Sequence, residues 1–236
     1  MRTIVLFLIY ILFSILLVPV LLFCYLMKRS QPIISISKWA LRLGQKVLGI
    51  SLDVSGEDKI KKEKSYVFMS NHLSLIDGPL LYMFIPQSVR VLLKKEVFKL
   101  PIIGQAMRQV GFVPVDRKAL KGGKESIDRA ARLMKEKCFS FLIFPEGTRS
   151  RDGKMQRFKR GGFFLALESQ AAIAPVSIDG SYELMPKGSF FAKKGRIRVI
   201  FHQPVSVEGL ERNNISVLRD RVRAIIQEGL RREGLQ

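Results

Sequence analysis

The chain of 236 residues has few cysteines and few histidines. Its two cysteines, Cys24 and Cys138, predict no disulfide framework, and both are expected to be small buried side chains in a reducing compartment. The two histidines, His72 and His202, form no cluster with cysteines at the spacing of a metal site. The sequence therefore predicts no metal and no other cofactor.

Acidic residues are also scarce, with 20 Asp and Glu against 40 Lys and Arg and a formal net charge of +20. A chain this basic is expected to meet anionic partners, such as phosphorylated substrates, an acidic protein or an anionic membrane surface. The basic residues are not interleaved with aromatic ones in the way that single-strand binding requires, so nucleic acid is not an expected partner.

No charged residue occurs from Thr3 to Met27. As a helix, this stretch is long enough for a bilayer core of roughly 30 Å. It lacks the short apolar region and cleavage site of a secretory signal, and Pro19 is expected to kink it. A single span would place the basic flank that follows, and the domain after it, in the cytoplasm.

A second segment, Ile33 to Ile50, has the spacing of an amphipathic helix, and Trp39 suits a membrane interface. The two segments are therefore predicted either as a span followed by a surface helix or, with slight preference, as a hairpin that enters one leaflet. We predict membrane-attachment helices in residues 1–50 and a folded α/β domain in residues 51–236, on the cytoplasmic side of the inner (plasma) membrane. A core-facing surface helix is the ordinary alternative for Ile33 to Ile50.

From residue 51 onward, strand-like runs alternate with helical ones, which predicts an α/β fold with a mostly parallel or mixed central sheet flanked by helices. Ligands in such sheets gather at the carboxyl ends of strands. Two polar loops follow predicted strands: SNHLSLIDGP after YVFMS, and PEGTRSRDGK after FSFLIF.

The first loop places His72 five positions before Asp77. The ordinary interpretation is a helix start, with Ser74 as the cap and Asp77 in the first turn. The functional interpretation is that Asp77 accepts the N–H of a folded-back imidazole, which leaves the other ring nitrogen as a base. This spacing alone favours neither.

No nucleophile accompanies the pair, because no G-x-S-x-G motif surrounds Ser70 or Ser74. A histidine and aspartate pair without a nucleophile is suited to activating a hydroxyl of the substrate. If the electrophile is a thioester, the weakly basic leaving thiolate needs little help from an acid. His202 has no carboxylate close in sequence and is interpreted as a strand-end residue.

The second loop concentrates arginine and lysine between Phe144 and Gly162. Guanidinium groups and free backbone N–H groups suit a phosphate. The P-loop motif is absent, so hydrolysis of a nucleoside triphosphate is not expected. The ordinary alternative is a solvated basic loop near lipid headgroups.

NHLSLID and FPEGTRS together resemble the signature of the glycerolipid acyltransferase family, most closely that of bacterial 1-acylglycerol-3-phosphate acyltransferases. The resemblance covers roughly Tyr66 to Gly180. It implies that His72 is the general base and Asp77 its orienting partner. The implied substrate-binding residues are Glu146, Gly147, Thr148, Arg149, Arg117 and Lys94.

The resemblance also implies the reaction: a fatty acyl group passes from acyl-CoA or acyl carrier protein to the sn-2 hydroxyl of lysophosphatidic acid, giving phosphatidic acid in phospholipid biosynthesis. Two alternatives remain open at this point. In the first, the acceptor is glycerol 3-phosphate, another lysophospholipid or a lipid amine. In the second, the protein is a non-catalytic, membrane-bound module that binds anionic lipid or nucleic acid through its basic face.

Overall fold

The computed structural model describes residues 2–16, 18–27, 29–116 and 120–231, and within them seven strands form one sheet in the order β1-β7-β6-β2-β5-β3-β4. Each neighbouring pair is parallel except β6 and β7. The strands are β1 (Ile50–Ser55), β2 (Val67–Ser70), β3 (Val89–Lys94), β4 (Val113–Val115), β5 (Ser140–Ile143), β6 (Ile173–Asp179) and β7 (Gly195–Phe201). The predicted mostly parallel α/β sheet is confirmed.

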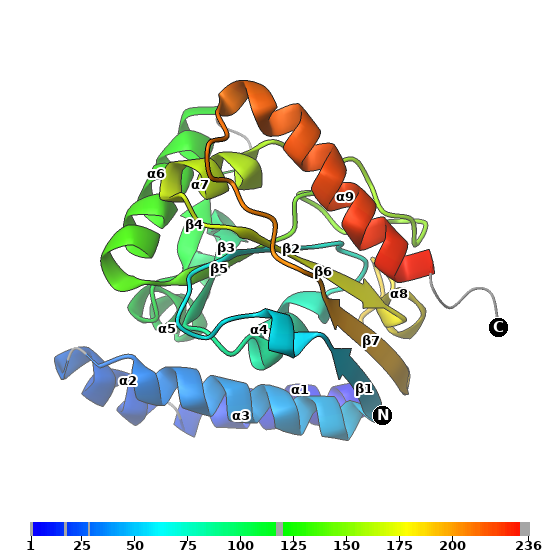
Figure 1. Ribbon diagram of the computed structural model, residues 1–236. Helices are drawn as coiled ribbons and strands as arrows, with labels where there is room; N and C mark the ends of the chain where they lie inside the picture. Colours follow the sequence, from blue (N-terminus) through cyan, green and yellow to red (C-terminus); the bar gives the residue numbers. More distant parts are fainter. Residues whose placement is uncertain (1, 17, 28, 117–119, 232–236) are drawn as a thin grey trace.

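Helices cover both faces of the sheet (Figure 1). On one face lie α6 (Leu120–Lys137), α7 (Gly161–Ser169) and α9 (Ile215–Arg231). On the other face lie α4 (Asp77–Phe84) and the N-terminal helices. The remaining helical segments are α5 (Ile103–Gln109), α8 (Ser181–Leu184) and the 3₁₀ turns η1 (Glu57–Lys59), η2 (Lys95–Lys99) and η3 (Arg212–Asn214).

Strand β2 lies at the centre and is buried along its whole length. Because side chains of a strand point alternately to opposite faces, Phe68 packs into the core beneath α4, whereas Val67 and Met69 pack beneath α6, α7 and α9. Burial on both faces explains why this strand is continuously apolar in the sequence.

The N-terminal helices are α1 (Arg2–Leu16), α2 (Val18–Leu26) and α3 (Gln31–Leu48). The last of these folds back along the first, since the Tyr10 hydroxyl donates to the Ala40 carbonyl oxygen and the Phe13 ring lies 5.7 Å from that of Trp39. Gly49, with φ of 70°, ends α3, so Ile50 opens β1 and is not part of the helix as predicted. The two apolar segments thus form a helical hairpin.

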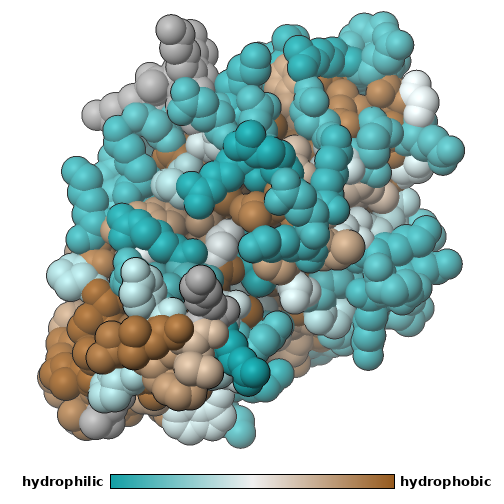
Figure 2. Space-filling view, turned by 90° about the vertical axis from the view of Figure 1, so that its left-hand side faces the viewer, coloured by the Kyte–Doolittle hydropathy of each residue, from teal (hydrophilic) through white to brown (hydrophobic). Residues whose placement is uncertain are grey.

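Much apolar surface of this hairpin is exposed, and Figure 2 shows it as a brown region at the lower part of the molecule. The exposed side chains include Phe7, Leu8, Leu12, Leu22, Phe23, Leu26 and Trp39. No single helix among the described residues is long and apolar enough to cross a membrane. The pair Arg2–Phe13 and Val18–Leu26, bent by 45°, passes that test together.

Three residues outside the two loops, Cys24, Cys138 and His202, were also given expected positions. Cys24 is buried as expected, but the prediction for Cys138 was wrong: it is exposed. It follows the last residue of α6 with φ of 50°, and the strand begins only at Ser140. His202 follows the last residue of β7, and its Nε2 lies 2.7 Å from the Ser177 hydroxyl, which also donates to a carbonyl oxygen of α9.

Candidate active site

The two loops singled out in the sequence leave the same edge of the sheet. Strands β2 and β5 are parallel neighbours, with Met69 opposite Ile143, so their carboxyl ends lie side by side. The loops are bonded to each other: the His72 N–H donates to Glu146 Oε1 at 2.8 Å, and the Ser150 N–H donates to the His72 carbonyl oxygen at 2.8 Å. His72 is therefore held through both backbone groups by a loop that is distant in sequence.

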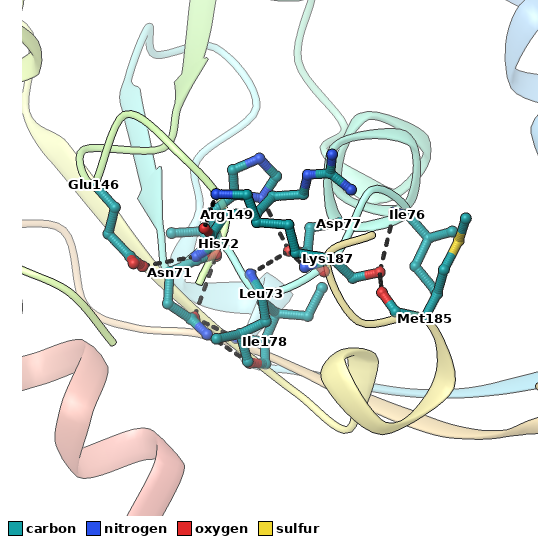
Figure 3. A network of polar contacts seen from close by, with 12 residues as sticks. Asn71, His72, Leu73, Ile76, Asp77, Glu146, Arg149, Ile178, Met185 and Lys187 are labelled. Carbon is teal, nitrogen blue, oxygen red and sulfur yellow. Dashed lines mark hydrogen bonds and ion pairs between the residues drawn. The ribbon is translucent and has the colours of Figure 1, made fainter. Parts of the chain in front are cut away.

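The imidazole of His72 meets the carboxylate of Asp77, with Nδ1 and Oδ2 3.0 Å apart (Figure 3). The same oxygen accepts the N–H groups of Leu73 and Ser74, each at 2.7 Å. Because this oxygen already accepts two hydrogen bonds, Nδ1 is the atom that carries the proton. Nε2 is then left with a free lone pair.

The ring of His72 has a fixed plane as well as a fixed tautomer. It stacks on Phe144, with centroids 4.0 Å apart and planes inclined by 18°. The His72 side chain is 19% exposed, whereas that of Asp77 is fully buried. The pair thus combines a buried anion with an imidazole that solvent or a substrate can reach.

Asp77 lies in the first turn of a helix, as in the ordinary interpretation, but Ser74 is not the cap of that helix. The helix α4 begins only at Asp77, and no side chain caps its first turn. The Ser74 hydroxyl instead donates to the Met185 carbonyl oxygen at 2.7 Å. Asp77 itself accepts the N–H groups of Leu73 and Ser74, so one carboxylate closes the turn and holds the imidazole.

Asn71 was quoted in the motif without a role, and the structure gives it one. Its buried side-chain amide donates to the Ile178 carbonyl oxygen at 2.8 Å and accepts the Ile178 N–H at 2.9 Å. The amide thereby continues the pairing of β2 with β6 by one position and holds the backbone just before His72.

Glu146 is buried, with 2% of its surface exposed. Its second oxygen accepts the Gln156 N–H at 3.0 Å, so the carboxylate connects three backbone segments. Burial raises the pKa of the Glu146 carboxyl from 4.5 to about 7, and the hydrogen bonds from Gln156 and His72 only partly oppose this rise. Glu146 therefore braces the loops and points at backbone groups.

This raised pKa predicts a pH-dependent stability. The folded chain holds the Glu146 proton more tightly than the unfolded chain, so this contribution to stability is complete below pH 4.5 and is lost as the pH rises to about 7. The loss is expected to be at most about 3 kcal/mol. Urea unfolding across this range should show a steeper decline for the wild type than for Glu146→Gln. Parallel curves for the two proteins would contradict the assignment.

The end of the second loop is secured by Lys187, which was not predicted. Its ammonium group donates to Thr148 Oγ1 and to the Arg149 carbonyl oxygen, both at 3.0 Å. Figure 3 shows the Arg149 guanidinium and the His72 ring projecting to the same side of the network, away from Asn71 and Ile178. No local pattern in the sequence points to Lys187, which lies 38 residues from Arg149.

The structure shows less about the other predicted substrate-binding residues, Lys94, Gly147 and Arg117. Lys94 ends β3, which neighbours β5, and its ammonium group lies 3.7 Å from the Glu96 carboxylate on the exposed surface. Gly147 takes φ of 73°, a conformation that a side chain would strain. Arg117 lies outside the described residues. Within the described ranges, no group of three or more His, Cys, Asp or Glu side chains is placed to hold a metal ion.

Comparison with known proteins places this site in a family context. Residues 51–179 match the family model described as Acyltransferase. The 1-acyl-sn-glycerol-3-phosphate acyltransferase alpha of Mus musculus is 30% identical over 89% of this chain and 73% of its own length. The 1-acyl-sn-glycerol-3-phosphate acyltransferase of Limnanthes douglasii is 33% identical over 69% of this chain, and the match spans only 57% of that relative.

A solved structure shares the whole fold. The crystal structure of the 1-acyl-sn-glycerophosphate (LPA) acyltransferase from Thermotoga maritima superposes with a TM-score of 0.84 and 25% sequence identity. The match covers 100% of this chain and 95% of that one. The similarity therefore includes the N-terminal helices as well as the sheet.

Proposed function

The chain belongs to the acyltransferase family, and from this premise we propose that it transfers a fatty acyl group from an acyl thioester to the sn-2 hydroxyl of lysophosphatidic acid, yielding phosphatidic acid. Its relatives from Limnanthes douglasii, Mus musculus and Thermotoga maritima are named as acyltransferases of that acceptor. The observation that carries the proposal is the contact of the His72 imidazole with the Asp77 carboxylate. The backbone of His72 is also hydrogen-bonded to the loop that contains Arg149.

In the proposed reaction, His72 acts as the general base. Its Nε2 takes the proton of the sn-2 hydroxyl as that oxygen attacks the thioester carbonyl carbon. The positive imidazole that forms faces the buried Asp77 carboxylate at 3.0 Å, which stabilises it. The carbon–sulfur bond then breaks, and the proton on Nε2 passes to the leaving thiolate, which restores the neutral histidine.

The acceptor phosphate is proposed to bind the basic loop after β5. Arg149 is the leading residue because its guanidinium is on the same side of the network as the His72 ring (Figure 3). Its backbone is held by Lys187 and by the Gln156 side chain, so the guanidinium starts from a fixed position. We propose Arg117 and Lys94 as further phosphate partners and Glu146, Gly147 and Thr148 as the frame of the acceptor site.

Arg149→Ala is expected to raise the KM for lysophosphatidic acid by about 10–100-fold, because a charge-assisted hydrogen bond contributes about 1.5–3 kcal/mol. The kcat at saturation should fall much less. Steady-state kinetics at a fixed acyl donor concentration measures both constants.

The matched control for Arg149 is Arg151→Ala, which removes an exposed guanidinium of the same loop. This variant should keep the wild-type KM. An unchanged KM for Arg149→Ala, with normal turnover, would mean that Arg149 contacts something other than the acceptor.

One assay tests the proposed function as a whole. The purified protein is given acyl-CoA or acyl-loaded carrier protein as donor, each crossed with lysophosphatidic acid, glycerol 3-phosphate and an unphosphorylated lysolipid as acceptor. Transfer to lysophosphatidic acid with at least one donor is the expected result. Rejection of lysophosphatidic acid together with acceptance of another lipid would overturn the proposed acceptor.

We also propose that residues 1–50 attach the protein to the cytoplasmic face of the inner membrane and that residues 51–236 form the catalytic domain. The apolar surface of α1 and α2 supports this, since a surface of this size is seldom left in water. A hairpin that enters one leaflet fits a bent pair of short helices folded against a third. An anionic membrane surface also complements a net charge of +20.

A further inference from the structure

A short loop between α8 and β7 holds two aromatic residues away from the core. A turn begins it: the Ser189 N–H donates to the Pro186 carbonyl oxygen at 3.0 Å, and Gly188 between them has φ of 99°. The Ser189 hydroxyl then donates to the Phe191 carbonyl oxygen and accepts the Phe191 N–H. The loop is therefore ordered by its own hydrogen bonds.

The two aromatic residues are Phe190, which is 83% exposed, and Phe191, which is 58% exposed. Exposing two large neighbouring rings is unfavourable in water. The ordering of the loop does not require them, because the bonds described above use only backbone groups, Gly188 and the Ser189 hydroxyl. Core packing thus does not account for these exposed side chains. A partner surface that covers the two rings would account for them.

The loop lies beside the N-terminal helix α1. The Ala192 N–H donates to the Thr3 hydroxyl at 3.1 Å, and Gly49 lies between the Arg2 guanidinium and the Lys194 side chain. The turn of α1 that follows Thr3 carries Ile4, which is 52% exposed, and more exposed apolar residues follow it. The loop that carries the two phenylalanines is therefore hydrogen-bonded to the start of α1, next to exposed apolar side chains of that helix.

The charged residues that neighbour the rings in sequence are all basic. From residue 184 to residue 207 the chain contains no aspartate or glutamate. Lys193 and Lys194 directly follow the aromatic pair and its alanine. Aromatic rings next to lysines match an anionic bilayer, since the rings enter the interface while the ammonium groups remain at the headgroups.

We propose that Phe190 and Phe191 insert into the interface of an anionic bilayer and form a second membrane contact beside the helical hairpin. The same loop reaches the catalytic residues, because the Met185 carbonyl oxygen accepts the Ser74 hydroxyl and Lys187 holds Thr148 and Arg149. Insertion of Phe190 and Phe191, which form the tip of this loop, therefore positions both active-site loops above the lipid surface from which a membrane-resident acceptor arrives.

Tryptophan fluorescence tests the insertion in the full-length protein. The only tryptophan, Trp39, is replaced by phenylalanine, and Phe190→Trp then provides a single reporter at the tip. On vesicles of phosphatidylglycerol and phosphatidylethanolamine, its emission should shift to the blue, and lipids with brominated acyl chains should quench it strongly.

Val217→Trp in the same Trp39→Phe background is the matched control. Val217 is an apolar side chain that is 73% exposed, but it lies on α9 across the sheet from the N-terminal helices. The tryptophan at position 217 should remain accessible to aqueous iodide and be little quenched by the brominated lipids. Equal, weak lipid quenching at positions 190 and 217 of vesicle-bound protein would overturn the proposal. A blue shift at position 190 that appears only with acyl carrier protein would overturn it in favour of a protein partner.

A kinetic assay of acyl transfer provides a second test, which rests on the proposed function. The double variant Phe190→Ser with Phe191→Ser should lose about 3–10-fold in kcat/KM for lysophosphatidic acid embedded in vesicles, because two apolar side chains that would enter the bilayer interface are replaced by polar ones. It should keep its kcat/KM for a short-chain acceptor dissolved in water. Equal losses with both acceptors would overturn the membrane role. If the wild type transfers no acyl group at all, the proposed function fails while the fluorescence result still decides the insertion.

Discussion

Replacement of His72 by alanine is expected to lower kcat for acyl transfer by about 10²–10⁴-fold, the contribution of a general base. The fold should survive, because the loop is held through the backbone N–H and carbonyl oxygen of residue 72 as well as by Asp77. The loss should appear in kcat more than in KM, since the imidazole acts on the reacting hydroxyl. Single-turnover transfer with the active donor measures the effect.

The other histidine offers a matched control. His202 meets Ser177 beside α9, away from the two loops. His202→Gln should therefore keep transfer near the wild-type rate, while urea unfolding of both variants in detergent checks that each is folded. Retention of more than a few per cent of activity by folded His72→Ala would rule out His72 as the base.

Asp77→Asn is expected to reduce kcat by about 10²–10⁴-fold while the protein stays folded, because the neutral amide cannot balance the imidazolium charge. The asparagine oxygen can still accept the N–H groups of Leu73 and Ser74, which Asp77 Oδ2 accepts now. The loop therefore keeps most of its hydrogen bonds. Comparison of kcat with the free energy of unfolding separates catalysis from stability.

Asp77→Ala tests the structural part of the same interaction. Both loop N–H groups would lose their acceptor in a buried site, at a cost of roughly 1–3 kcal/mol for each. We expect this variant to be both inactive and clearly less stable, and the asparagine variant to be inactive but nearly as stable as the wild type. A fully active Asp77→Asn would show that the carboxylate only closes the turn.

Several elements of the fold were readable from the sequence for local reasons. The run FSFLIF is apolar throughout because β5 is covered on both faces, and α9 shows helical spacing because it buries one side, including Leu218, Val222 and Ile226. Such signals depend on residues within a few positions of each other. The hairpin of the two N-terminal segments was likewise one of the two arrangements predicted.

Two expectations were wrong because a local sequence pattern does not determine where the chain turns or which distant group a side chain contacts. Ser74 matched a helix cap, but the carbonyl oxygen of Met185, 111 residues away, takes its hydroxyl hydrogen bond. Cys138 was expected to be buried, but the chain turns there with φ of 50° between α6 and β5, and the side chain is exposed. Neither outcome follows from residues nearby in sequence.

By itself the sequence determined the kinds of element, the polar loops that follow β2 and β5, and the candidate base and basic loop within them. Only the tertiary structure decided that those loops touch. Strand order depends on how the apolar faces of the whole chain are covered, and it placed β2 between β5 and β6. That order brings Glu146 to the backbone of His72 across 74 residues of sequence. It also lets the loop of Lys187 and Phe190 connect the loop of Arg149 to the N-terminal helix.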